Sequence, residues 1–95
     1  MNHEQPNQTV WIFHGEQGRF SSGVFSSVDI AEKWISKHKL SGVLTEYPLN
    51  VGVYDWAIEN DFFTVKKDSQ EESKFIQNFT TANQEHFHYQ DGLLD

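Results

Sequence analysis

Thr9-Val10-Trp11-Ile12-Phe13-His14 is the stretch that decides the fold of this 95-residue chain. It is rich in β-branched and aromatic residues and is followed by Gly15. Both faces of a strand formed by these residues would be apolar, with Val10 and Ile12 on one and Trp11 and Phe13 on the other. A strand with two apolar faces belongs in the interior of a sheet and not at its edge. We therefore expect residues 9–14 to form a strand with a neighbour on each side.

The segments around this strand predict its partners. Residues 15–18 are turn residues, with Gly15 and Gly18 free to take a positive φ, and they lead into a second strand at about 19–25. The two strands read as a hairpin, and Gly23 inside the second predicts a bulge or a close backbone approach. Further strands are expected at 42–47, 75–79 and 84–89, and a helix through 71–79 is the alternative for 75–79.

Residues 27–39 predict the main helix. Ser26 or Ser27 can cap it, and Ser26 with Asp29 has the spacing of a capping box. Its apolar stripe consists of Ile30, Ala31, Trp34 and Ile35, and Lys37, His38 and Lys39 gather where the helix dipole favours cations. A shorter helix is expected at about 51–60, with Asn50 as its cap, and residues 64–74 read as an exposed loop.

These elements predict an α+β fold: a single layer of about five mainly antiparallel strands packed by one main helix, plus a short second helix. The length fits one domain, which we place at residues 9–92 between a disordered tail at 1–8 and a C-terminal tail at 93–95. The residues expected in the core are Trp11, Phe13, Phe25, Trp34 and Phe62.

The composition excludes several classes of function. Fourteen acidic and seven basic residues give a net charge of −7, and residues 49–95, with nine acids and three lysines, carry −6 of it. This negative charge repels the phosphate backbone of nucleic acids and attracts a basic protein. The alternative explanation is that the charge only keeps a small protein in solution. The absence of cysteine excludes disulfides, thiolate metal sites and cysteine nucleophiles. Without a signal peptide or a long apolar run, we expect a cytoplasmic protein that does not enter a membrane.

Three histidines are the weak candidates for a metal site. His86 and His88 stand two apart on a predicted strand and therefore share one face, where His14 is the obvious third ligand. An H-x-H pair is a weak indication of a metal site, so the simpler interpretation is that both histidines lie on the polar face of a strand. We expect no cofactor. Asp55 and Glu59 share a helix face, but a convex helix lacks the cleft that paired catalytic carboxylates need. The chain contains no nucleotide-binding or hydrolase motif.

A second candidate site combines aromatic and acidic residues around Pro48. This mixture is typical of interaction hot spots that face basic partners, and packing around the proline turn is its alternative explanation. The residues expected to bind a partner are Glu46, Tyr47, Tyr54, Asp55, Trp56, Glu59 and Asp61.

Five segments together resemble a family of small bacterial domains of unknown function. They are residues 10–15, 22–26, 44–48, 52–58 and 84–89, so the resemblance spans about residues 9–92. It implies a compact bacterial domain and supplies no activity. Combined with the charge and the missing catalytic motifs, it favours an interaction module. An immunity protein or inhibitor that neutralises a basic toxin such as a nuclease is the particular form we consider. The alternative is a domain that binds a metal or a small ligand on its histidine-bearing face.

Overall fold

A computed structural model of the chain describes residues 8–95, which cluster into two compact units where sequence reasoning expects one domain. The first unit combines residues 8–49 with 84–95, and the second contains residues 50–83. Apart from Gln8, the tail expected at 1–8 lies outside the described residues. The elements of the first unit are β1 (Thr9–Gly15), β2 (Ser21–Phe25), α1 (Val28–His38), β3 (Gly42–Pro48), β4 (His86–Gln90) and β5 (Leu93–Leu94). Those of the second are α2 (Val53–Glu59), the 3-10 helix η1 (Asp68–Glu71) and α3 (Ser73–Gln77).

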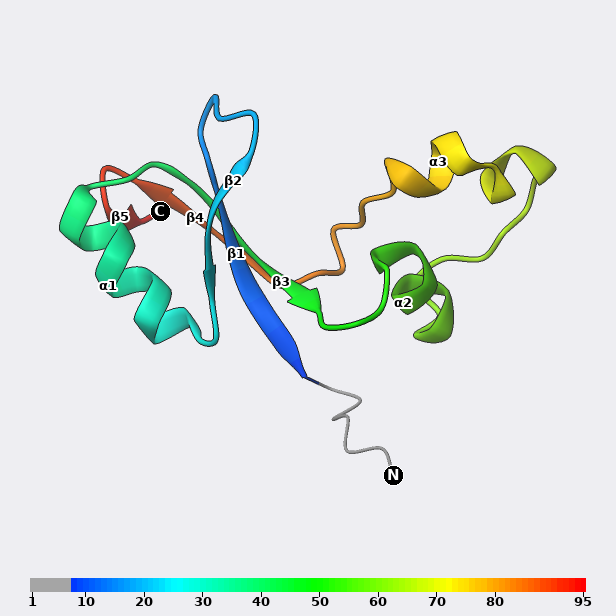
Figure 1. Ribbon diagram of the computed structural model, residues 1–95, viewed down its shortest axis with the longest axis horizontal. Coiled ribbons are helices and arrows are strands. Elements are labelled where there is room, and N and C mark those ends of the chain that lie inside the picture. Colours follow the sequence, from blue (N-terminus) through cyan, green and yellow to red (C-terminus); the bar gives the residue numbers. More distant parts are fainter. Residues whose placement is uncertain (1–7) are drawn as a thin grey trace. The chain divides into compact units, whose positions relative to one another are not determined.

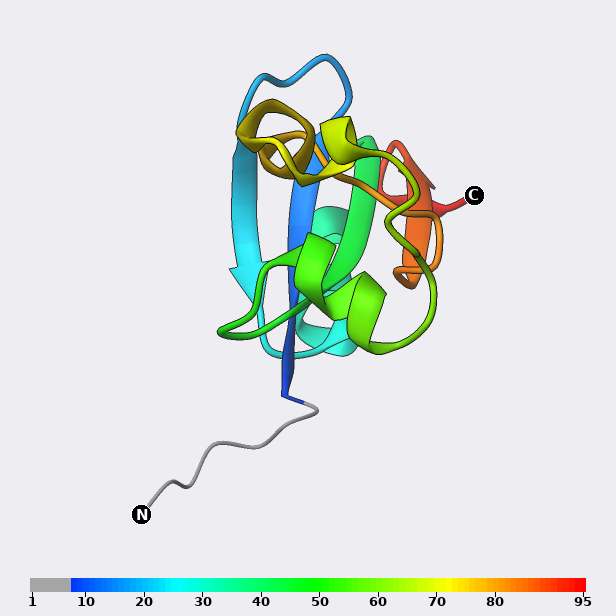
Figure 2. The same ribbon diagram turned by 90° about the vertical axis from the view of Figure 1, so that its right-hand side faces the viewer.

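The first unit is built on a five-stranded antiparallel sheet in the order β2-β1-β3-β4-β5 (Figures 1 and 2). β1 pairs with β2 on one side and with β3 on the other, which confirms its interior position. The α+β class is likewise confirmed. The five strands are not the expected five, because residues 75–79 contain no strand and Leu93–Leu94, expected in the tail, form β5.

The β1–β2 hairpin forms as predicted, with one change in its turn. The positive φ falls on Gln17, at 66°, and not on Gly15 or Gly18. The register shifts opposite Phe13 and His14, so the expected bulge is present. The backbone at Gly23 also lies close to neighbouring side chains, because a Cβ there would lie 2.7 Å from the Phe25 ring and 3.2 Å from Trp34.

The core of the first unit lies between α1 and one face of the sheet. Trp11 and Phe13 from β1, Leu44 from β3 and Tyr89 from β4 are buried against Ala31 and Ile35 of α1. Trp34 packs edge-on against Phe13, with ring centroids 5.8 Å apart. Because side chains alternate along a strand, the same packing assigns His14, His86 and His88 to the opposite face.

The main helix is confirmed over Val28–His38, and its cap is Ser27, whose Oγ accepts a 3.3 Å hydrogen bond from the Ile30 amide. The alternative cap at Ser26 is therefore not the one used. Ile30 does not belong to the buried stripe, since it is 51% exposed in the first turn. Lys39 ends the helix in the left-handed region, with φ 54°.

The regular elements of the second unit are all helical, so the strand expected at 75–79 is wrong. The helical alternative for residues 71–79 is confirmed only over Ser73–Gln77. A strand needs a neighbour for its backbone groups, and no strand lies among residues 50–83 to provide one. The short helix α2 is confirmed, but its N-cap is Gly52 in place of Asn50. Part of the expected loop 64–74 folds as η1, where the Gln70 Oε1 accepts from the Lys66 and Lys67 amides.

Within residues 8–95, no helix is long and apolar enough to cross a membrane.

Candidate functional site

The C-terminal end of α2 positions a group of exposed acidic and aromatic side chains. Asp61, just past the C-cap Asn60, has a left-handed φ of 63°. Its amide donates to the Ile58 carbonyl at 3.1 Å, and the Phe62 amide donates to Ala57 at 2.8 Å. These two bonds form a Schellman motif, which reverses the chain directly after the helix.

The reversal brings Phe62 against Trp56. Their ring centroids lie 5.3 Å apart at an interplanar angle of 52°, and Phe62 stays 45% exposed. Sequence reasoning expected Phe62 in the core, and that expectation is wrong. Its exposure follows from the Schellman turn, because the chain leaves the helix along the surface. Asp61 is a local signal for this turn, because aspartate tolerates a left-handed backbone.

Asp55, Glu59 and Asp61 are exposed around this aromatic pair. Glu59 is four residues from Asp55 and three from Trp56, so it neighbours both on the helix surface. We name this set, Asp55, Trp56, Glu59, Asp61 and Phe62, the acidic–aromatic surface. Trp56 is half-buried, as is usual for an aromatic side chain that contributes both packing and contact area.

The other residues expected to bind a partner have different environments. Tyr54 is only 9% exposed, and its hydroxyl donates to the Gln70 carbonyl at 2.9 Å, so it supports the second unit from inside. Glu46 and Tyr47 belong to β3 in the first unit and are half-buried. The Glu46 Oε2 accepts a 2.7 Å hydrogen bond from the Thr9 hydroxyl.

A four-ring cluster forms the interior of the second unit and was not foreseen as a unit. Tyr54 contacts Phe63, Phe75 and Phe79 at ring-centroid distances of 5.9, 6.2 and 5.5 Å. Beside it runs an apolar hollow of about 510 Å³, which we name the aromatic groove. It is lined by four aromatic residues, Phe62, Phe63, Phe75 and Phe79, and by four polar residues, Lys74, Asn78, Thr80 and Thr81.

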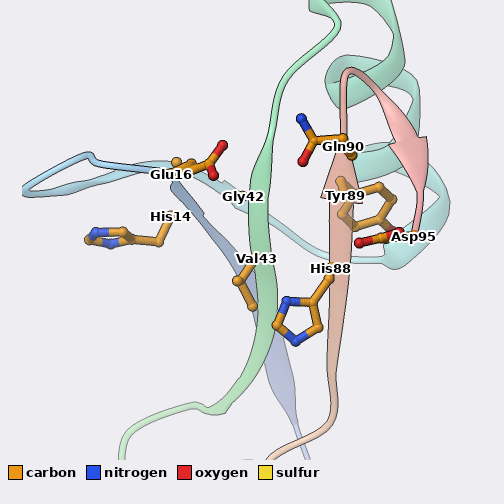
Figure 3. A pocket seen from close by; sticks show the side chains of 9 residues that line it. His14, Glu16, Gly42, Val43, His88, Tyr89, Gln90 and Asp95 are labelled. Carbon is orange, nitrogen blue, oxygen red and sulfur yellow. The ribbon is translucent and has the colours of Figure 1, made fainter.

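A third feature is an open depression of about 490 Å³ at one end of the sheet (Figure 3). It contains two of the predicted histidines, His14 from β1 and His88 from β4, together with Glu16, Gln90 and Asp95. Sequence reasoning named the histidines but missed the other three residues, because only the strand order brings these segments together.

The structure does not bring the three histidines to one metal position. His14 pairs with Val43 on β3, and Val43 pairs with His88 on β4, so Val43 stands between the two imidazoles (Figure 3). Two strand spacings separate their backbones by about 10 Å. The His14 Nε2 donates to the Gly18 carbonyl at 2.6 Å, which holds this ring toward the hairpin turn.

His86 and His88 do share a face, as predicted, with ring centroids 5.4 Å apart. The His86 Nδ1 is occupied by a 2.8 Å hydrogen bond to the Gln84 carbonyl. Among residues 8–95, no group of three or more histidine, aspartate and glutamate side chains is arranged to hold a metal ion.

One titratable group in the first unit has a strongly shifted pKa. Burial of Tyr89, with a smaller contribution from its hydrogen bond to Glu32 and that carboxylate's charge, raises the pKa of the phenol far above its usual value of 10.0. The 2.6 Å bond joins β4 to the middle of α1. Glu32 does not belong to the apolar stripe predicted for the helix, yet it is half-buried and bonded to the core.

The fold and these surfaces define an α+β domain with a small second unit whose regular elements are helical. The sequence matches the family described as "Domain of unknown function (DUF7710)" over residues 10–95, so the chain belongs to that family. Comparisons with the curated proteins and with the solved structures give no match.

Proposed function

We propose that this protein is a small acidic bacterial interaction module that binds a basic protein through the acidic–aromatic surface. An immunity protein or inhibitor that neutralises a basic toxin, such as a nuclease, is the particular form we favour. The proposal rests chiefly on one observation: the half-buried Trp56 contacts the exposed Phe62, and three exposed carboxylates lie on the same helix or directly after it. Aromatic residues dominate interface hot spots, and neighbouring acids select a partner of opposite charge.

The distribution of charge supports this choice of partner. Residues 50–83 carry six carboxylates and three lysines, a net charge of −3, so the unit that holds the aromatic pair is itself acidic. A basic protein approaching such a surface is steered toward it, and its association rate falls with added salt. Nucleic acid would be repelled by the same charge.

The backbone at Asp61 fixes the position of one of these carboxylates. Aspartate tolerates the left-handed region that the Schellman turn requires, and Gln17, Lys39 and Asp91 also have a positive φ. The turn thereby places the Asp61 carboxylate next to Phe62, directly after α2.

The test compares two double charge reversals in the same unit. Asp55→Lys/Glu59→Lys alters the acidic–aromatic surface, and Glu71→Lys/Glu72→Lys makes the same change in charge outside it. Low-salt pull-down with mass spectrometry identifies a basic partner, whose association rate is then measured with each variant. We expect association to slow about tenfold with the first pair and far less with the second. Equal effects of the two pairs would reduce the role of this surface to net charge alone.

The depression at the end of the sheet supports a second candidate function, the binding of a small polar ligand beside His14 and His88. Its volume of about 490 Å³ lies within the range of roughly 300–1,000 Å³ found for ligand pockets. A screen of small amines and carboxylic acids by amide chemical shifts tests it. Shifts confined to Val43, His88 and Gln90, lost in His88→Ala, are the expected result, and no shift in these residues would eliminate it.

A further inference from the structure

We propose that the depression at the end of the sheet binds an aliphatic diamine, whose two ammonium groups pair with Glu16 and Asp95 while its carbon chain lies over Val43. This inference rests on the second candidate function, the binding of a small polar ligand, and names the chemical class of that ligand. All residues of the site belong to the first unit, so the inference is independent of the acidic–aromatic surface.

The charged groups that line the depression argue for a cation. Glu16 and Asp95 supply its two carboxylates, and none of its nine lining residues is lysine or arginine. Both side chains are exposed, and neither forms a hydrogen bond or an ion pair with another of residues 8–95. Their charge is therefore not neutralised within the described part of the chain, and a ligand of opposite charge is attracted to the depression.

The backbone holds the two carboxylates far apart. The Glu16 amide donates to the Ser41 carbonyl at 2.9 Å, directly before β3 begins. The Asp95 amide donates to the His88 carbonyl of β4 at 2.8 Å. Because Glu16 follows β1 and Asp95 follows β5, three strand spacings separate their backbones by about 14 Å. Figure 3 shows the two side chains on opposite sides of β3, an arrangement that suits an extended ligand with a charge at each end.

The surface between the carboxylates suits an alkyl chain. Val43 lies on the open face of the sheet between His14 and His88, which occupy the neighbouring strands (Figure 3). Its branched side chain is shorter than the two imidazoles, so a hollow with an apolar floor remains between the rings. Methylene groups that lie there leave water, which favours a ligand whose middle part is apolar.

Three probes of equal chain length test the charge requirement, observed through the backbone amide resonances of the full-length protein in low-salt buffer. Cadaverine, a five-carbon diamine, is expected to shift the amides of Val43, His88 and Gln90. Pentylamine has one ammonium group and is expected to bind about fivefold more weakly, because one ion pair is lost. Pentanediol has no charge and should cause no shift. Equal affinity of cadaverine and pentylamine, or shifts located in residues 50–83, would overturn the proposal.

Two double substitutions distinguish the site from the overall negative charge. Glu16→Gln/Asp95→Asn removes both carboxylates from the depression, and Glu71→Gln/Glu72→Gln removes the same charge from the second unit. All four side chains are exposed, and the amide resonances show directly whether each variant is folded. Loss of the cadaverine shift at Val43 in the first variant and its retention in the second support the proposal. Equal weakening in both variants would reduce the binding to net charge and contradict it.

The outcomes separate this inference from the candidate function on which it rests. If cadaverine causes no shift while a carboxylic acid shifts Val43, His88 and Gln90 and loses this effect in His88→Ala, the depression binds another class of ligand and only the present inference fails. If none of the ligands shifts these residues, the second candidate function fails together with it.

Discussion

The Tyr89 hydroxyl donates a 2.6 Å hydrogen bond to the Glu32 Oε2, joining β4 to α1 across 57 residues of sequence. Tyr89 is 4% exposed, so its hydroxyl depends on this acceptor. The bond fixes the main helix on the sheet at a point where the core is otherwise apolar.

Replacing Tyr89 by phenylalanine should therefore destabilise the first unit. Hydrogen bonds to a charged group contribute about 1.5–3 kcal/mol, and the Glu32 carboxylate would be left half-buried without its donor. Urea unfolding of Tyr89→Phe measures the loss. The control Glu32→Gln retains an acceptor and should cost less. An equal loss in both variants would indicate that the charge of Glu32 contributes more than the bond itself.

Stability should fall above pH 10 through the same residue. The pKa of Tyr89 is raised in the folded protein, so the folded state holds a proton that the unfolded state releases near pH 10. The contribution is complete below that pH and is lost as pH rises toward the folded pKa, at up to about 1.4 kcal/mol per pH unit. Urea unfolding at pH 9 to 11 measures it. Tyr89→Phe should show a smaller decline than the wild-type chain.

Gly42→Ala should destabilise the sheet. A Cβ at Gly42 would collide with the backbone oxygen of His14 and would lie 2.8 Å from the Gly15 Cα, neither of which a side-chain rotation can relieve. Overpacking of this kind costs about 1–3 kcal/mol. Thermal unfolding compares it with Gly52→Ala, whose Cβ would meet only the Asp55 carboxylate, at 3.6 Å. Similar melting temperatures for both variants would contradict this steric account.

Two substitutions at Asp61 separate its geometry from its charge. Asparagine tolerates the left-handed region, so Asp61→Asn should keep or slightly raise stability while it slows association with a basic partner. Asp61→Ala removes both the tolerance of a left-handed backbone and the negative charge. It should therefore slow association and also lower the free energy of unfolding by about 1 kcal/mol. Chemical unfolding and association kinetics give the two readouts. Unchanged kinetics in Asp61→Asn would remove this carboxylate from the proposed interface.

Zinc should leave the melting temperature unchanged. His14 and His88 are separated by Val43, and the His14 Nε2 is already bonded to the Gly18 carbonyl. Calorimetry with excess Zn²⁺ tests this, with His88→Ala as the comparison. A rise in melting temperature that disappears in His88→Ala would show that the histidines rearrange to bind the metal.

Much of the first unit follows from local sequence. Alternation along residues 9–14 identified the interior strand, helical spacing identified α1, and Gly23 marked the bulge. The second unit was harder, because apolar residues are few between 64 and 83, and periodicity over five residues does not separate a strand from a helical turn. Residues 75–77 are helical, and Phe75 and Phe79 join a ring cluster in which no strand is present to pair with them.

The candidate sites likewise combine features that local sequence predicted with features that only the fold decided. Local sequence identified Asp55, Trp56, Glu59 and Asp61 as an acidic and aromatic group. Asp55 and Glu59 on α2 and Asp61 just after it are exposed, whereas Trp56 is half-buried. Only the Schellman turn decided that Phe62 contacts Trp56 and stays exposed while Tyr54 becomes core, because burial depends on where the chain goes after the helix. The sequence by itself determined the fold class, the charge and the missing catalytic motifs, since these depend on residue type and near-neighbour spacing. The tertiary structure alone decided which distant residues meet, as with Tyr89 and Glu32, because strand order and helix packing set those contacts and no local pattern encodes them.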